Sequence, residues 1–298
     1  MTRSTDRRGV LKMAAAAGGV LALGLTVPAR AAAAPGPVVT RPEVRTLTGQ
    51  QWRDFVAAVH QLHSGNTTPN PYDRLVAVHY SNAPRAHGRP EFLPWHRVYL
   101  SRFEKSLQQI NPSVVLPYWD WSRDAQAPER SPVLSSSYFG GLGRKSDGVV
   151  VDGAFGNWRC AVPSNHLLRR TTEAEIPAFG SAEVLDVIVS RPTSYDQLRR
   201  NLESKAHATV HMGIGGNNGD MSYMYAPNDP VFWVSEAFTD LLWAEWQQRH
   251  PTLARTYNGG RNAKPADLLT PFHVTVESTF NTRDLGYTYP RWSAESSA

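Results

Sequence analysis

The chain has 298 residues, of which 41% are hydrophobic and 19% charged, so it can bury a substantial core and is not globally disordered. Residues 1–31 hold five basic side chains and one acidic one, which is +4 of the formal net charge of +5, and the remainder shows no basic stripe for nucleic acid or anionic lipid. The single cysteine, Cys160, excludes an intramolecular disulfide and a cysteine-based metal site, so any metal must be held by histidine and carboxylate.

The first 31 residues are typical of a twin-arginine export signal. DRRGVLK at 6–12 matches the twin-arginine pattern, an apolar stretch covers 13–27, and PARA at 28–31 is typical of a cleavage site. The apolar run of about 15 residues is shorter than the roughly 20 that span a bilayer, and no later run is longer. We therefore expect a cleaved signal peptide at 1–31, one mature domain at 32–298, and secretion through the bacterial twin-arginine pathway with no membrane segment left after cleavage.

The mature chain is predicted to be mainly α-helical. Thr48 and Gln51 form a capping-box pattern at the start of the first helix, and Pro230 after Asp229 favours the start of the last one. The periodicity predicts helices over residues 48–63, 71–82, 94–110, 194–212 and 230–250. The segments between them, especially 122–192 and 251–298, are predicted to be long irregular connections with a few short strands. We see no repeat and no linker, which favours a single domain with a core of about four helices.

Five of the ten histidines fall on or between these helices. His79 lies on the second helix, His96 opens the third, and His87 lies in the loop between them. His207 and His211 are four residues apart, so they share one helix face one turn apart, a usual way to present two imidazoles to one ion. Imidazole suits copper and zinc, so two such groups in a cysteine-poor chain predict a metal site.

Four motifs give this chain a resemblance to a known family. HGRPEFLPWHRVYLSRFE at 87–104 resembles the first copper signature of the tyrosinases, and NDPVFW at 228–233, followed by Asp240, resembles the second. LPYWDW at 116–121 and YTY at 287–289 also belong to the pattern. The chain is therefore identified as a member of the tyrosinase family over residues 48–290.

The resemblance implies a type-3 copper centre on a four-helix bundle, in which two copper ions are each held by three histidines. It implies oxidation of phenols, catechols or o-aminophenols, small aromatic substrates, by dioxygen. By position, the resemblance assigns the first copper to His79, His87 and His96 and two ligands of the second copper to His207 and His211. It also assigns to Asp229 a carboxylate that orients a ligand imidazole, and to Phe232 an aromatic ring packed beside the coppers.

One position departs from the pattern. Where the family has the sixth histidine, four residues after Phe232, this chain has Glu236. With His207 and His211 it makes a two-histidine, one-carboxylate set, which also suits non-haem iron and zinc. Glu236 is therefore either a ligand of the second metal, which is copper, zinc or iron, or a residue that pairs with a base and leaves that site altered. Because Phe232, Glu236 and Asp240 share a helix face, we expect the carboxylate to point into the bundle.

The substrate is expected to be an o-diphenol or an o-aminophenol. The resemblance places Ala208 where monophenol-hydroxylating bacterial members have an asparagine, and Glu203 stands nearest to their water-holding, catalytic glutamate. We therefore expect weak monophenol hydroxylation. Two other hypotheses stay open, a redox-silent, mixed-metal or single-copper protein of the same fold, and a binding or structural protein without metal. Because the chain carries its own signal, a copper-delivering helper protein is allowed but not required.

Overall fold

A computed structural model describes residues 38–64, 69–260 and 262–297. The expected signal peptide at 1–31 and the start of the expected mature domain lie outside the described residues. In the part that is described, no helix is both long enough and apolar enough to cross a bilayer.

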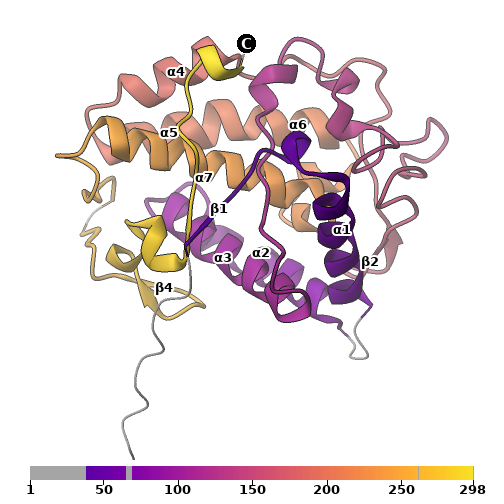
Figure 1. The fold of residues 1–298 in the computed structure, drawn as a ribbon, viewed down its shortest axis with the longest axis horizontal. Coiled ribbons are helices and arrows are strands. Elements are labelled where there is room, and N and C mark those ends of the chain that lie inside the picture. The colour runs from indigo at the N-terminus through magenta and orange to yellow at the C-terminus, as the bar shows by residue number, and fades with distance from the viewer. Residues whose placement is uncertain (1–37, 65–68, 261, 298) are drawn as a thin grey trace, which may run out of the picture. The chain divides into compact units, whose positions relative to one another are not determined.

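Seven α-helices are present in the described part of the chain, so the prediction of a mainly α fold is confirmed (Figure 1). Their bounds are α1 Gly49–His63, α2 Pro71–Ala86, α3 Phe92–Ile110, α4 Ala182–Ser190, α5 Tyr195–Asn201, α6 Ala208–Gly215 and α7 Val231–Arg249. The six strands have two residues each: β1 Val39–Thr40, β2 Arg159–Cys160, β3 His166–Leu167, β4 Leu268–Leu269, β5 Val274–Thr275 and β6 Tyr287–Thr288. They pair as β1 with β6 in parallel, and β2 with β3 and β4 with β5 antiparallel.

The ends of the helices follow the predicted capping residues. The Thr48 side chain accepts from the backbone N–H of Gln51, whose own side chain accepts from Thr48 N–H, which completes the capping box of α1. The Asp229 carboxylate accepts from the N–H of Val231 at the start of α7. The helix predicted over 194–212 differs from the structure, because α5 and α6 are separated by a π-helical segment, Leu202–His207.

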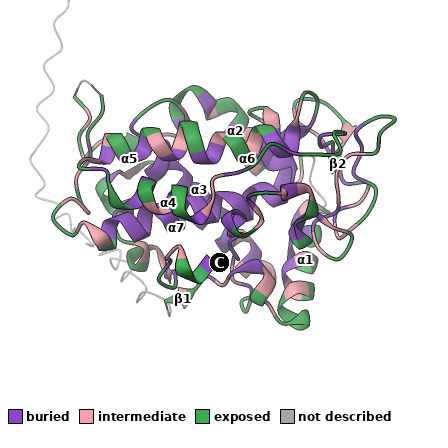
Figure 2. Cartoon of the chain, turned by 90° about the horizontal axis from the view of Figure 1, so that it is seen from above, coloured by how far each residue is buried: buried purple, intermediate pink, exposed green. Residues whose placement is uncertain are grey.

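Helices α1, α2, α3 and α7 form the part of the core that carries most of the expected site. α3 contacts α1, α2 and α7. Every residue of α7 from Val231 to Gln247 is buried, including the polar side chains among them, so α7 runs through the interior of the fold (Figure 2). The Trp233 ring on α7 stacks on Phe103 of α3 with ring centroids 3.8 Å apart, which holds the two helices in register at the level of the histidines.

Candidate metal centre

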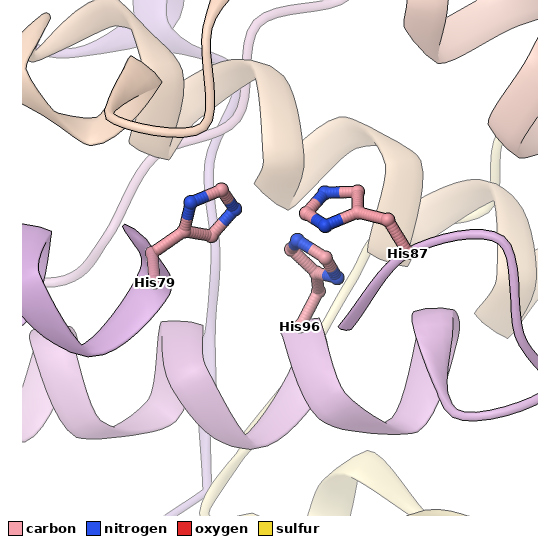
Figure 3. Close-up of side chains that lie close together, drawn as sticks. All are labelled: His79, His87 and His96. Atoms are coloured by element: carbon pink, nitrogen blue, oxygen red, sulfur yellow. The ribbon is translucent and has the colours of Figure 1, made fainter. Parts of the chain in front are cut away.

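Three histidines converge between α2 and α3. His79 comes from α2, His87 directly follows the end of α2, and His96 lies in the first turns of α3. One ring nitrogen of each lies within 4.8 Å of those of the other two. Figure 3 shows the three imidazoles turned toward a common point from these two helices. The structure therefore brings together the three residues that the sequence assigns to the first metal.

Hydrogen bonds define which ring nitrogen of His79 and of His96 is free to bind a metal. Nδ1 of His79 bonds the carbonyl oxygen of Met224 at 2.7 Å, and Nδ1 of His96 bonds that of Phe92 at 2.8 Å. A carbonyl only accepts, so Nδ1 carries the proton and Nε2 keeps its lone pair. Within the described residues, Nε2 of His79 and Nε2 of His96 are buried and have no hydrogen-bond partner. Unpaired buried acceptors aimed at one point fit a bound cation.

The charge state of this cluster also suits a metal. Burial, together with repulsion from the neighbouring imidazoles, lowers the pKa of His79 to about 3, that of His87 to about 2 and that of His96 to about 3. The nearby Glu236 carboxylate opposes this shift without cancelling it. All three rings are therefore neutral near pH 7, the form in which imidazole binds a metal.

A second cluster faces the first one. His207 ends the π-helical segment, His211 follows on α6, and the Glu236 carboxylate enters from α7, where it is 1% exposed. Oε1 of Glu236 lies 2.6 Å from Nε2 of His207 and 3.1 Å from Nε2 of His211. The carboxylate points into the bundle, as the spacing on the last helix predicts. The ring of His207 lies 6.4 Å from those of both His87 and His96, so the two clusters are neighbours.

The second cluster requires a cation. His211 donates from Nδ1 to the carbonyl of Met221 at 2.9 Å, and His207 donates to the backbone carbonyl of Glu203. If both rings were neutral, their Nε2 lone pairs would face the Glu236 carboxylate, which also only accepts. Either a proton or a metal ion must lie between them. Oε2 of Glu236 has no hydrogen-bond partner within the described residues, so a second carboxylate oxygen is free to bind a cation.

The distances describe the protonated form of this cluster. Burial alone lowers the pKa of His207, but the Glu236 carboxylate outweighs burial and raises it. Burial in turn raises the pKa of Glu236, and the contact with His207 outweighs this and holds that pKa well below its usual range. Two ligands of one ion at roughly 2.0–2.2 Å lie about 3 Å or more apart. His207 and Glu236 must therefore separate slightly when they share a metal.

Phe232 and Asp229 are the two residues that the resemblance assigns to the surroundings of the metals. Phe232 lies between the sites, with its ring 5.2 Å from that of His79 and 5.8 Å from that of His211, in the place that the resemblance implies. Asp229 does not orient a ligand imidazole. Its carboxylate accepts from Arg170 at 2.7 and 2.9 Å, and both side chains are fully buried. Backbone carbonyls instead hold the Nδ1 atoms of the histidines.

Glu203 connects the two halves of the site. It lies in the π-helical segment, and its Oε1 accepts from the N–H of Gly88, directly after His87, at 2.5 Å. Its Oε2 accepts from Arg199 at 3.0 Å. In this segment the N–H of Ala208 bonds the carbonyl of Glu203, five residues back, a wider turn than in an α-helix. The Glu203 carboxylate thereby reaches the loop that carries His87, a residue of the first cluster.

The remaining histidines lie outside the two clusters. His60 and His63 bond the carbonyls of Ala154 and Arg159. His166 forms a third group with Cys160 and Asp220, but its Nδ1 faces the Ser164 carbonyl and its Nε2 faces Asp220, both of which are acceptors. Its pKa is raised, chiefly by the hydrogen bond to Asp220, and two acceptors facing its two ring nitrogens leave no lone pair free for a metal ion.

Both clusters open on one cavity of about 580 Å³. Its wall combines the histidines with small, polar and sulfur-containing side chains, namely His79, His87, His207, His211, Gly88, Arg199, Arg200, Glu203, Ser204, Ala208, Met212, Met221, Ser222, Tyr223 and Met224. Such a cavity, mostly apolar with a few convergent polar groups, has the size of a site for a small organic molecule.

Comparison with known proteins identifies the family. Residues 69–249 match the common central domain of tyrosinase. The chain belongs to the tyrosinase family. A tyrosinase from Streptomyces antibioticus is 36% identical over 281 residues, which cover 85% of this chain and 99% of that one. A tyrosinase from Streptomyces glaucescens is 38% identical over 240 residues, 72% of this chain and 84% of that one.

The fold agrees with this assignment. A polyphenol oxidase variant from Thermothelomyces thermophila superposes with a TM-score of 0.72 at 22% identity, over 85% of this chain and 89% of that one. A functional unit of octopus hemocyanin has the same fold, with a TM-score of 0.65 at 20% identity, over 87% of this chain and 71% of that one. The tyrosinase-family chain is thus a copper oxidoreductase, and the family implies a binuclear copper site.

Three residues that shape the site were not among those predicted from the sequence. The carbonyls of Met221 and Met224 orient His211 and His79, but every residue has a carbonyl, so no motif marks them. The Phe92 ring, 4.8 Å from His96 and 5.1 Å from His207, closes the space between the clusters. Phe92 lies inside the first copper signature, and its place in that motif was the one signal available.

Proposed function

We propose that this protein uses dioxygen to oxidise o-diphenols or o-aminophenols at a metal pair held by His79, His87 and His96 on one side and by His207, His211 and Glu236 on the other. The two neighbouring clusters that open on one cavity carry this proposal. A copper pair bound there supplies the redox chemistry by which dioxygen takes electrons from the aromatic ring.

The residues of the chain bind and orient the substrate. The apolar part of the cavity wall accepts the aromatic ring and excludes water from its faces. Glu203 lines the same cavity and is fixed by Gly88 and Arg199, so it is placed to accept a proton from a substrate hydroxyl, directly or through a water. Ala208, next to His207, offers no hydrogen bond to such a water, which favours diols and aminophenols over monophenols.

The metal content of the full chain tests the ligand assignment. His96→Ala removes one of three ligands from the first cluster and is expected to lower the copper content by one ion per chain and abolish oxidation of an o-diphenol. His60→Ala is the control, because His60 is exposed and lies outside both clusters. Unchanged copper content in His96→Ala would contradict the assignment.

One observation favours a second candidate function. The contact of 2.6 Å between His207 and Glu236 is closer than two ligands of one ion, and it is satisfied by a proton. The alternative is a protein with one metal in the first cluster, or with zinc or iron in the second. Wild-type protein with one ion per chain, or with a second ion other than copper, would support this alternative over the copper pair.

The expected export signal, the single mature domain at 32–298 and secretion remain proposals of the sequence. A helper protein that delivers copper is compatible with the open cavity but is not needed for the proposed chemistry. Purification of the secreted chain, N-terminal sequencing of the mature form and metal analysis without added partners test these points together. A mature chain that begins near residue 32 and binds copper unaided is the expected result.

A further inference from the structure

One short segment of the chain orients a histidine in each of the two clusters. It covers residues 220–228, between α6 and α7. Its Met221 carbonyl accepts the Nδ1 proton of His211 at 2.9 Å, and its Met224 carbonyl accepts that of His79 at 2.7 Å. The hydrogen bond at one ring nitrogen of a metal-binding histidine fixes the tautomer and the direction of the other nitrogen. The position of the 220–228 segment therefore affects both clusters.

A buried carboxylate, that of Asp220, holds the beginning of this segment. Asp220 is 2% exposed. Its Oδ1 accepts from Nε2 of His166 and from the side-chain amide of Asn228, both at 2.8 Å. Its Oδ2 accepts from the N–H of Arg169 at 2.9 Å, and its own N–H donates to the Arg169 carbonyl at 2.9 Å. Both carboxylate oxygens and the backbone N–H of Asp220 are thus engaged.

These bonds close the 220–228 segment into a loop. Asn228 lies eight residues after Asp220, and the bond between their side chains joins the two ends of the segment. Met221 and Met224 lie between these ends, so the carbonyls that orient the histidines belong to the closed loop. The other partners of Asp220 lie in β3 and shortly after it, which fastens the loop to the hairpin of β2 and β3.

The chemistry of this junction requires a carboxylate. The N–H groups of His166, Asn228 and Arg169 all point to one side chain, and a carboxylate accepts at both of its oxygens without presenting a donor. Without the carboxylate these donors lose their acceptor, and the ends of the segment lose their connection. The segment is then expected to shift, and the carbonyls of Met221 and Met224 shift with it.

We propose that Asp220 is a positioning residue for both metals, because its carboxylate fixes the segment whose carbonyls orient His79 and His211. The proposal rests on the proposed function of these histidines as metal ligands. Asp220 does not line the cavity, and its side chain bonds no histidine of the two clusters. It therefore acts on the two metals through the 220–228 segment, and its loss affects both of them together.

Proton exchange in the metal-free full chain tests this role directly. Nitrogen-15 NMR follows the Nδ1 protons of His79, His96 and His211. In Asp220→Ala, the protons of His79 and His211 are expected to exchange with water about tenfold faster, because their acceptors move. That of His96 is expected to keep its rate, since its acceptor, Phe92, lies on the same helix. Unchanged exchange at His79 and His211, or equal acceleration at all three histidines, would overturn the proposal.

Variants of His166 answer the same question if Asp220→Ala does not fold. His166→Leu removes one donor and leaves the carboxylate with its other partners, so a smaller acceleration at His79 and His211 is expected. His166→Gln supplies an amide N–H to Asp220 again and is expected to bring the exchange rates back toward those of the wild type. In that case, wild-type exchange rates in His166→Leu would overturn the proposal.

The matched control is Asp120→Ala. Asp120 is also 2% exposed and also joins distant segments, since it accepts from Trp292 at 3.2 Å and from Ser297 at 2.6 Å. These partners lie outside the 220–228 segment. Asp120→Ala is therefore expected to lower Tm and to leave the exchange of all three histidine protons unchanged. Faster exchange at His79 and His211 in this variant would contradict a local effect of Asp220.

The affinity for copper gives the second readout. Cu(I) is titrated into the metal-free chain without oxygen, in competition with a chromophoric chelator. Asp220→Ala is expected to weaken the binding of both ions by about tenfold, as is usual for residues that orient metal ligands. Wild-type affinity for both ions, or weaker binding of one ion alone, would overturn the proposal. Wild-type protein that binds no copper would instead contradict the proposed function, and proton exchange in the metal-free chain would still decide the role of Asp220.

Discussion

Replacing Glu236 by alanine tests the second cluster most directly. The carboxylate is 1% exposed, and its Oε1 contacts both His207 and His211. If it is a ligand, Glu236→Ala lowers the metal content from two ions per chain to one and leaves His79, His87 and His96 loaded. Restoring an imidazole with Glu236→His is expected to keep or raise the copper content and to increase phenol oxidation, because a neutral, softer ligand supports Cu(I).

Glu236→Ala is also expected to destabilise the metal-free protein. There Glu236 is the counter-charge of the buried His207, and removing one partner of a buried pair destabilises a protein by about 3–5 kcal/mol. The pKa of His207 is raised, so its contribution is complete below about pH 6.5 and is lost as the pH rises through the folded value. The pKa of Glu236 is lowered, so its contribution is complete above about pH 4.5. The penalty is therefore expected to be largest between about pH 4.5 and 6.5.

Metal analysis and calorimetry at pH 6 measure these effects, and a loss of 3–5 kcal/mol corresponds to a fall in Tm of roughly 10 °C. The matched control is Glu245→Ala, because Glu245 is also buried on α7 but pairs with Arg249 and Arg291. It is expected to lower Tm and leave the metal content unchanged. Two ions and an unchanged Tm in Glu236→Ala would refute the reasoning about this cluster.

Three further predictions concern substrate, acid and the buried ion pair. Ala208→Asn is expected to raise tyrosine hydroxylation relative to oxidation of an o-diphenol by several-fold, because the amide can orient a water beside Glu203; an unchanged ratio of the two rates would contradict this. The metal-free protein is expected to lose up to about 4 kcal/mol of its free energy of unfolding between pH 7 and 5.5, as measured by urea unfolding. The three histidines of the first cluster have lowered pKa values and stay unprotonated in the folded state, whereas the same histidines bind protons in the unfolded chain. Arg170→Met strands the buried Asp229 and is expected to cost about 3–5 kcal/mol in the same assay, and a loss below about 1 kcal/mol would show that the pair contributes little.

The sequence predicts well those features that depend on local pattern. The capping box of α1, the proline at the start of α2 and the turn between His207 and His211 are all encoded within a few residues. The spacing of four between Phe232, Glu236 and Asp240 puts them on one helix face, and this local pattern is enough to predict that the Glu236 carboxylate points into the bundle. The convergence of the clusters was predicted through the family motifs, since spacing alone does not show which helices are neighbours.

Features that depend on distant segments were not predictable. Arg170 comes from the irregular stretch between α3 and α4, and no pattern connects it to Asp229, 59 residues later. The π-helical segment depends on hydrogen bonds over five residues, and the residues in Leu202–His207 suit an ordinary helix equally well. One extra residue in that turn changes the direction of Glu203, which is why its bond to Gly88 could not be derived from its distance to His207.

The two clusters differ in charge, and this difference has a chemical consequence. The first holds three imidazoles that stay neutral at pH 7, whereas the second adds one buried carboxylate beside His207 and His211. Within a water-poor site an adjacent negative charge stabilises the higher charge of a metal ion more than the lower one. If Glu236 is a ligand of the second metal, as proposed, the second position would favour Cu(II), and the first would accommodate Cu(I) and Cu(II) more evenly. A pair built on these ligands is electronically unequal, and Glu236, the residue that creates the inequality, is also the one whose replacement by histidine would remove it.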